Sequence, residues 1–122
     1  DLLADTDALP AVFHCAAGKD RTGLLAALVL GALGVERDSI VADYVLTEVA
    51  MERILDRLRE TPERAEYLAT TPKSFFAADG DAMHRVIDDI ERDHGSIRDF
   101  TRSIGVSEAT LERLVAAYVA TL

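Results

Sequence analysis

A short segment of the chain combines a cysteine with an arginine six positions later. Cys15 is the one cysteine among the 122 residues, and Arg21 follows it after five intervening residues. A thiolate is a strong nucleophile, and a guanidinium presents a planar pair of donors that matches two oxygens of a phosphoryl group. These residue types at this spacing indicate transfer of a phosphoryl group to the cysteine sulfur.

The residues between them are suited to bind phosphate through the backbone. Small side chains allow a ring of N–H groups to approach an anion closely, and Gly18 can adopt a left-handed conformation. The start of a helix after the loop favours the thiolate form of Cys15. The predicted phosphate-binding loop covers residues 15–21, with Cys15 as nucleophile and these ligands: Ala16, Ala17, Gly18, Lys19, Asp20 and Arg21.

Three flanking residues have supporting roles in this prediction. The ring of His14 can bond nearby backbone and hold the shape of the loop. The hydroxyl of Thr22 can donate to the sulfur, which makes the sulfur a better leaving group when an intermediate breaks down. Gly23 allows the following helix to pack closely beneath the loop.

The extended pattern is far more specific than the cysteine and arginine alone. H-C-x2-G-x2-R-T-G stands directly after the apolar residues 11–13 and before an apolar segment. A buried cysteine in an ordinary strand–helix turn is the alternative interpretation. A nucleotide-binding loop of the Walker type does not fit, because Asp20 follows Gly18-Lys19 and position 13 is not glycine.

The elements around the loop are predicted from hydrophobic spacing and from turn residues. A strand over residues 11–15 enters the loop, and Gly34 ends the first helix. Asp38 is expected as the N-cap of the second helix, and Pro62 in the first turn of the third. The expected helices cover residues 21–33, 39–60, 62–68, 81–94, 96–103 and the segment from 107 onward.

One strand cannot form a sheet, and its backbone groups would lack partners if it were buried. We therefore interpret residues 1–122 as the C-terminal part of a single α/β domain: one strand, the phosphate loop, then about six helices over 21–122. The earlier strands of the sheet are expected upstream of residue 1. A second chain that supplies the sheet is the alternative.

The loop resembles the signature of the protein tyrosine phosphatases. Its variant Ala17-Gly18-Lys19-Asp20-Arg21-Thr22-Gly23 is similar to the bacterial branch typified by mycobacterial protein tyrosine phosphatase B. The segments Asp43-Tyr44-Val45-Leu46-Thr47 and His94-Gly95-Ser96-Ile97 are also similar to that branch. The resemblance implies the cysteine-phosphatase α/β fold and hydrolysis of phosphate monoesters through a phosphocysteine intermediate.

The resemblance also bears on the proton donor. Most members of the family use an aspartate on a separate upstream loop, whereas the similar bacterial branch implies a donor at Asp20. The alternative role for Asp20 is to orient Arg21 or the loop. Asp5 and Asp7 precede the expected strand by too few residues to reach over the site.

Composition excludes several other classes of function. The formal net charge of -9 argues against nucleic acid as a partner, and no apolar run is long enough for membrane insertion. One cysteine and the ten-residue spacing of His84 and His94 do not fit a metal site, so we expect neither metal nor cofactor. Tyr44 and Tyr118 are expected in the core, and Phe75-Phe76 as packing residues rather than a lid.

Substrate and reaction class leave alternatives open. The leading prediction is a tyrosine or dual-specificity phosphatase acting on phosphorylated proteins. Lys19 makes a phosphoinositide an alternative substrate, and a non-catalytic phosphate-binding domain is a further alternative. A low-molecular-weight phosphatase or arsenate reductase fits poorly, because the chain has no Asp-Pro dipeptide and no second cysteine. The sequence does not distinguish a cytoplasmic from a secreted protein.

Overall fold

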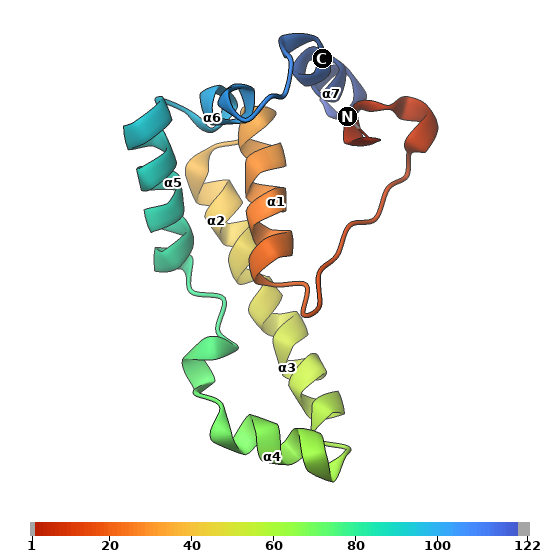
Figure 1. Ribbon diagram of the computed structural model, residues 1–122, viewed down its shortest axis with the longest axis vertical. Coiled ribbons are helices and arrows are strands. Elements are labelled where there is room, and N and C mark those ends of the chain that lie inside the picture. Colours follow the sequence, from red (N-terminus) through yellow and green to blue (C-terminus); the bar gives the residue numbers. More distant parts are fainter. Residues whose placement is uncertain (1, 120–122) are drawn as a thin grey trace.

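The computed structural model describes residues 2–119, so both ends of the predicted 1–122 domain, Asp1 and residues 120–122, lie outside the described residues. The described part contains seven α-helices and three short 3-10 helices (Figure 1). In chain order they are η1 (Leu2–Ala4), η2 (Thr6–Ala8), α1 (Asp20–Ala32), α2 (Arg37–Val45), α3 (Thr47–Leu58), α4 (Pro62–Thr70), η3 (Lys73–Phe75), α5 (Gly80–His94), α6 (Ile97–Ser103) and α7 (Glu108–Tyr118).

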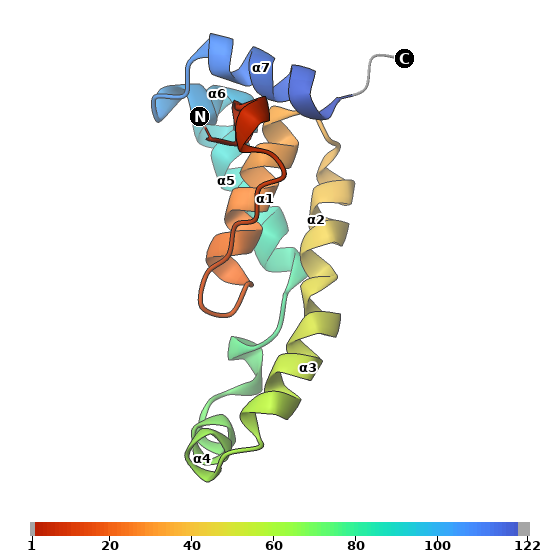
Figure 2. The ribbon, with the colours of Figure 1, turned by 90° about the vertical axis from the view of Figure 1, so that its right-hand side faces the viewer.

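The centre of the molecule is a group of three helices, α1, α2 and α5, crossed at one end by α6 (Figures 1 and 2). Ile40 of α2 and Ile87 of α5 are almost fully buried where the helices meet. Burial of such side chains is the main favourable term in folding. The main core cluster comprises Ala27, Ile40, Val41, Tyr44, Ala78, Met83, Ile87 and Ile97.

A second, smaller cluster joins α7 and the N-terminal turn η1 to the far end of α1. Leu111 is 2% exposed there and packs with Ala4, Ala32 and Leu114. The side chain of Ser107 accepts a hydrogen bond from the backbone N–H of Thr110, which caps α7. The prediction that the last helix starts after Ser107 is confirmed.

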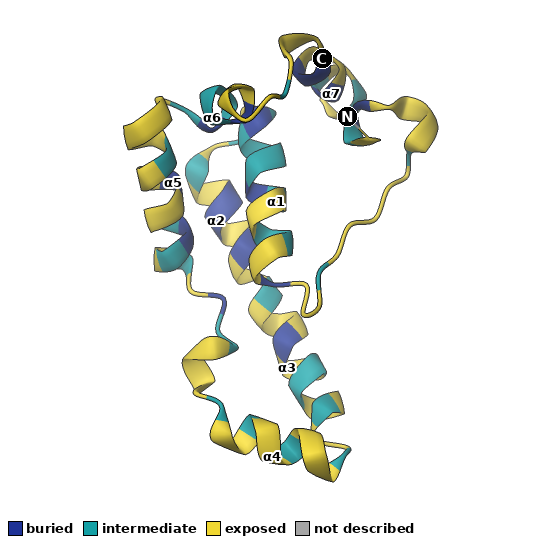
Figure 3. Cartoon of the chain, viewed as in Figure 1, coloured by how far each residue is buried: buried dark blue, intermediate teal, exposed yellow. Residues whose placement is uncertain are grey.

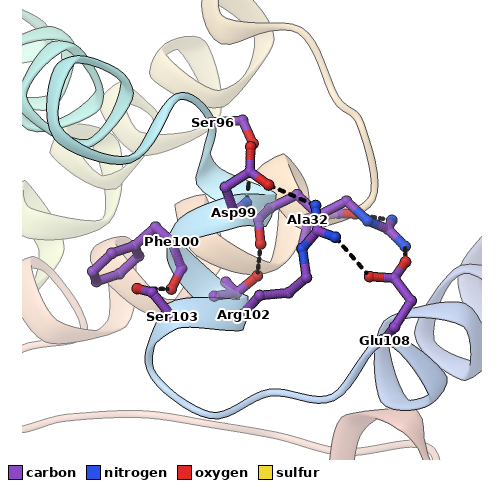
Figure 4. A network of polar contacts seen from close by, with 9 residues as sticks. Ala32, Ser96, Asp99, Phe100, Arg102, Ser103 and Glu108 are labelled. Atoms are coloured by element: carbon purple, nitrogen blue, oxygen red, sulfur yellow. Dashed lines mark hydrogen bonds and ion pairs between the residues drawn. The ribbon is translucent and has the colours of Figure 1, made fainter.

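A polar network fixes the corner between α1, α6 and α7 (Figure 4). The Arg98 guanidinium donates to the carbonyl oxygen of Ala32 at the end of α1 and to the Glu108 carboxylate at the start of α7. Arg102 forms ion pairs with Asp99 and Glu108. Isolated surface ion pairs contribute little, but a shared carboxylate with two arginines restricts the angle between these helices.

The strand expected over residues 11–15 is not present in the described structure. Among residues 2–119 no strand is assigned, and the segment forms no backbone hydrogen bond with another segment. A strand exists only by pairing with a neighbour, and no described residue supplies one. Within the described part the protein is helical, and the expected α/β sheet is not confirmed there.

The helix expected over residues 39–60 is two helices. α2 ends at Val45, α3 begins at Thr47, and Leu46 between them has φ -56° and ψ -21°. At this turn the N–H of Val49 bonds the carbonyl of Leu46, three residues earlier, so the helix tightens locally. The predicted cap at Asp38 is wrong, because Glu36, with extended backbone, precedes the first turn.

Residues 47–77, which we call the arm, extend away from the three central helices and comprise α3, α4 and η3 (Figure 2). Figure 3 shows α4 with exposed and half-buried positions and none that is buried, whereas α2 buries Ile40, Val41 and Tyr44. The arm carries several large exposed apolar side chains: Val49, Tyr67 and Phe75. None of the helices in residues 2–119 has the length and apolar character needed to cross a bilayer.

Residues 21–33 have almost no polar face, which predicts a buried helix, and the structure corrects this in part. Ala27 and Ala32 of α1 are buried, but Leu24 and Leu25 are 41% and 40% exposed. Val12, in the segment before the loop, is 91% exposed. The same end of the molecule therefore presents an uncovered apolar surface beside the loop.

Candidate active site

The predicted phosphate loop lies at the N-terminal end of α1 (Figure 1). Gly18 has φ +68°, a conformation that L side chains rarely adopt, so the chain turns sharply there. Lys19 is the N-cap of α1, and its carbonyl accepts the N–H of Gly23 at 2.7 Å. The first N–H groups of α1 therefore face the loop with no partner in the helix, an arrangement that favours an anion.

The Cys15 thiol is activated by this surrounding. Its pKa is lowered from 9.0 to about 6, first by the Thr22 hydroxyl and then by the backbone N–H of Thr22, with smaller contributions from the N–H groups of Gly18 and Ala17. Partial burial acts in the opposite direction. The groups that stabilise the thiolate outweigh the effect of burial on the pKa, so the sulfur is mainly an anion at neutral pH.

The Thr22 hydroxyl points into the protein and is available to the sulfur. Thr22 Oγ1 is buried and forms no hydrogen bond with any residue among 2–119. A buried hydroxyl without a partner is unusual in native proteins. It is nonetheless the largest cause of the lowered pKa of Cys15, which makes the thiolate the acceptor that it would bind.

Gly23 and Tyr44 explain how α1 is held beneath the loop. A Cβ atom added to Gly23 would lie 2.6 Å from Cδ2 of the Tyr44 ring, far inside van der Waals contact. Tyr44 is 9% exposed, so its ring fills the space under the first turn of α1, and its prediction as a core residue is confirmed. Burial, together with the charges of Asp20 and Asp79, raises the pKa of Tyr44.

Arg21 and His14 lie at the surface of the loop. The Arg21 side chain is exposed and forms no hydrogen bond or ion pair with any described residue, so its five donors are available to a ligand. Nδ1 of His14 lies 3.3 Å from the carbonyl oxygen of Cys15. That contact places the histidine ring against the backbone at the start of the loop.

Lys19 is buried, although a charged residue at the mouth of a site is usually exposed. The residue is 7% exposed, and its ammonium donates to the carbonyl oxygens of Phe75 at 2.7 Å and Ala77 at 3.1 Å. It also forms an ion pair with Asp20 Oδ1 at 3.2 Å. The positive charge thus faces the end of the arm.

Asp20 combines an anchored carboxylate with access to solvent. Its side chain is 70% exposed, although one oxygen is paired with Lys19. Asp20 has no ion pair with Arg21 among the described residues, so the geometry does not support an orienting role toward that arginine. The carboxylate stands at the first position of α1, adjacent to the predicted phosphate ligands.

Sequence reasoning did not find the partners of Lys19. The acceptors are main-chain carbonyl groups, which every residue has, and they lie 56 and 58 positions away. The Phe75 ring is 59% exposed and meets the Phe76 ring edge to face, so the predicted packing role of this pair is met only in part.

His94 packs against Phe100, with ring centroids 5.0 Å apart.

Comparison with known proteins shows the family of the chain. Residues 1–120 match the family described as "Tyrosine phosphatase family". The chain is 34% identical over 117 residues to "Triple specificity protein phosphatase PtpB" of Mycobacterium tuberculosis, which covers 86% of this chain and 42% of that protein. It is 32% identical over 111 residues to "Tyrosine-protein phosphatase" of Nostoc commune, which covers 84% of this chain and 37% of that protein.

The chain therefore belongs to the tyrosine phosphatase family. It spans about two fifths of the length of these curated relatives. The family predicted from the loop residues is confirmed.

Proposed function

We propose that this protein hydrolyses phosphate monoesters, with phosphotyrosine in proteins as the main substrate class, through a phosphocysteine intermediate. The observation that carries the proposal is the lowered pKa of Cys15, about 6, within a loop of backbone donors at a helix N-terminus. A thiolate held among anion-binding donors is the arrangement that nucleophilic phosphoryl transfer requires.

In the first step the Cys15 sulfur attacks phosphorus, and the bond from phosphorus to the ester oxygen breaks. The guanidinium of Arg21 and the N–H groups of the loop hold the equatorial oxygens, where charge is greatest in the transition state. Asp20 gives its proton to the departing oxygen. The products of this step are the free alcohol or phenol and the S–P bond at Cys15.

In the second step water attacks the phosphorus of the intermediate. Asp20, now a carboxylate, takes a proton from that water, the S–P bond breaks, and inorganic phosphate leaves with Cys15 restored as thiolate. The Thr22 hydroxyl donates to the departing sulfur. The role of Thr22 is supported by its buried hydroxyl and by its effect on the pKa of Cys15.

The range of phosphate monoesters that the protein hydrolyses is a second part of the proposal. The mycobacterial relative is named for triple specificity, which supports action on more than one class of phosphate monoester. Preference for a phosphoinositide, suggested by the sequence through Lys19, has less support, because that ammonium donates to two carbonyl groups of the arm. We therefore favour phosphorylated protein over lipid as substrate.

Activity is proposed for the complete protein rather than for these residues alone. The apolar side chains of Val12, Leu24 and Leu25 are exposed beside the loop. Strands of the same domain that pair with residues 11–15 would cover this surface. We propose that these strands hold the loop in its active shape.

The test is hydrolysis of p-nitrophenyl phosphate by the complete protein, with Cys15→Ser and Asp20→Asn as variants. Cys15→Ser should abolish turnover, and Asp20→Asn should reduce kcat by about 10²–10⁴-fold because a general acid is lost. Full activity of Cys15→Ser would refute the thiolate mechanism. Unchanged activity of Asp20→Asn would assign the proton donor elsewhere, and a folded but inactive parent that binds phosphate would favour a non-catalytic role.

A further inference from the structure

Lys19 is the one charged residue that is buried among residues 2–119. An ammonium group loses its hydration on burial and is stable there only if its donors are satisfied. Here the ammonium donates to the carbonyl oxygens of Phe75 and Ala77, and its charge is paired with the carboxylate of Asp20. A phosphate oxygen would have to compete with these three partners for the ammonium.

The two carbonyl groups mark the point where the arm returns to the core. Ala78, the next residue, is 2% exposed and belongs to the main core cluster. At its other end the arm joins α2 through the tight turn at Leu46. Lys19 is therefore bonded to one of the two points at which residues 47–77 are attached to the rest of the molecule.

The phosphate loop and the arm thus share one side chain. The backbone of Lys19 caps α1, and its ammonium lies 5.8 Å from the centre of the exposed Phe75 ring. A movement of residues 75–77 would remove two acceptors from a buried cation and leave the Asp20 ion pair as its remaining partner. Such a loss is costly for a buried charge, so loop and arm should move together.

We propose that Lys19 is a positioning residue that holds the arm, residues 47–77, against the phosphate loop. Lys19 also keeps the Asp20 carboxylate beside the phosphate loop. This inference builds on the proposed phosphatase function, but its central claim concerns the attachment of the arm. Lys19 acts on the reaction through the arm and through Asp20, and it does not contact the phosphoryl group.

The experiment compares Lys19→Met, Lys19→Arg and the control Lys73→Met in the complete protein. Lys73 is exposed on the arm and serves as a matched removal of a lysine. Hydrogen exchange of backbone amides is measured in phosphate-free buffer, and the Kd of inorganic phosphate is measured by titration. Methionine preserves an unbranched apolar stem, whereas arginine can again donate to the two carbonyls.

Lys19→Met should accelerate exchange in residues 60–77 by about tenfold or more, because hydrogen bonds from a charged donor hold that segment. Exchange in α5 should stay within about twofold of the parent, and Lys19→Arg should restore most of the protection. Lys73→Met should match the parent. The Kd of phosphate should change by less than about threefold in Lys19→Met, since phosphate is held by other groups.

Unchanged exchange in the arm, together with a phosphate Kd raised about tenfold or more, would overturn the proposal and make Lys19 a direct ligand. Acceleration spread evenly over α1, α5 and the arm would also overturn it, because Lys19 would then serve the whole core. A parent without phosphatase activity refutes the proposed function alone, and the exchange result then decides the role of Lys19 separately.

Discussion

Replacing Thr22 by alanine should raise the pKa of the Cys15 thiol and thereby slow its alkylation at acidic pH. The Thr22 hydroxyl is the largest of the groups that lower this pKa from 9.0 to about 6. Alanine removes the hydroxyl but retains the backbone N–H groups of residues 17, 18 and 22. The new midpoint should therefore lie above about 6 and below 9.0.

The magnitude follows from the thiolate population. At pH 6 about one half of the sulfur is thiolate for a pKa of about 6, against about one thousandth for a thiol of pKa 9.0. Loss of all stabilisation would thus slow alkylation at pH 6 by about 500-fold. Because the amide groups remain, we expect a smaller decrease, of about fivefold or more.

The assay is the rate of reaction with iodoacetamide between pH 4.5 and about 9.5, with each protein normalised to its own plateau at high pH. Normalisation is needed because a thiolate of higher pKa is also intrinsically more nucleophilic. Reactivity should increase with pH through a midpoint at about 6 in the parent. Thr22→Ser is the matched control, since it keeps the hydroxyl and should keep the midpoint.

An alkylation profile of Thr22→Ala that superimposes on the parent would refute this reasoning. The hydroxyl would then not reach the sulfur, and its burial without a hydrogen-bond partner would need another cause. A parent midpoint near 9 would refute the activation of Cys15 as a whole. Ultraviolet absorbance of the thiolate provides an independent check of either result.

Two further predictions concern the support of the site. Gly23→Ala should destabilise the protein by about 1–3 kcal/mol, because the added Cβ collides with the Tyr44 ring, less about 1 kcal/mol gained in helix propensity. The free energy of unfolding in urea measures this cost. A cost that persists in a Tyr44→Leu background would contradict the reasoning. Ile87→Ala, at a residue 1% exposed, should cost about 2–5 kcal/mol in the same assay, whereas Val86→Ala, at 38% exposure, should cost much less.

Most helices were predictable because their signals are local. Pro62 in a first turn, Ser96 and Ser107 as caps, and Gly34 after α1 are all features that a chain carries in short stretches. The boundaries at residues 37 and 46 were missed. The first depends on the extended backbone of Glu36, and the second on a local change in hydrogen bonding that spacing does not report.

The strand over residues 11–15 illustrates a different limit. Its apolar residues are typical of a strand, but pairing is a relation between two segments, and no described segment pairs with residues 11–15. Val12, Leu24 and Leu25 are apolar and yet exposed. Apolar side chains indicate that a surface should be covered, while only the assembled structure decides what covers it.

The sequence by itself determined the family and predicted the nucleophile and the anion-binding backbone, because residues 14–23 are contiguous and a turn at Gly18 followed by a helix start brings their groups together. Tertiary structure alone decided the environment of Lys19. The partners of its ammonium are carbonyl groups of Phe75 and Ala77, which carry no signal in the sequence and approach Lys19 only when the arm returns to the core. A buried ammonium must donate to whichever acceptors the fold brings within reach, and long-range packing decides which acceptors these are.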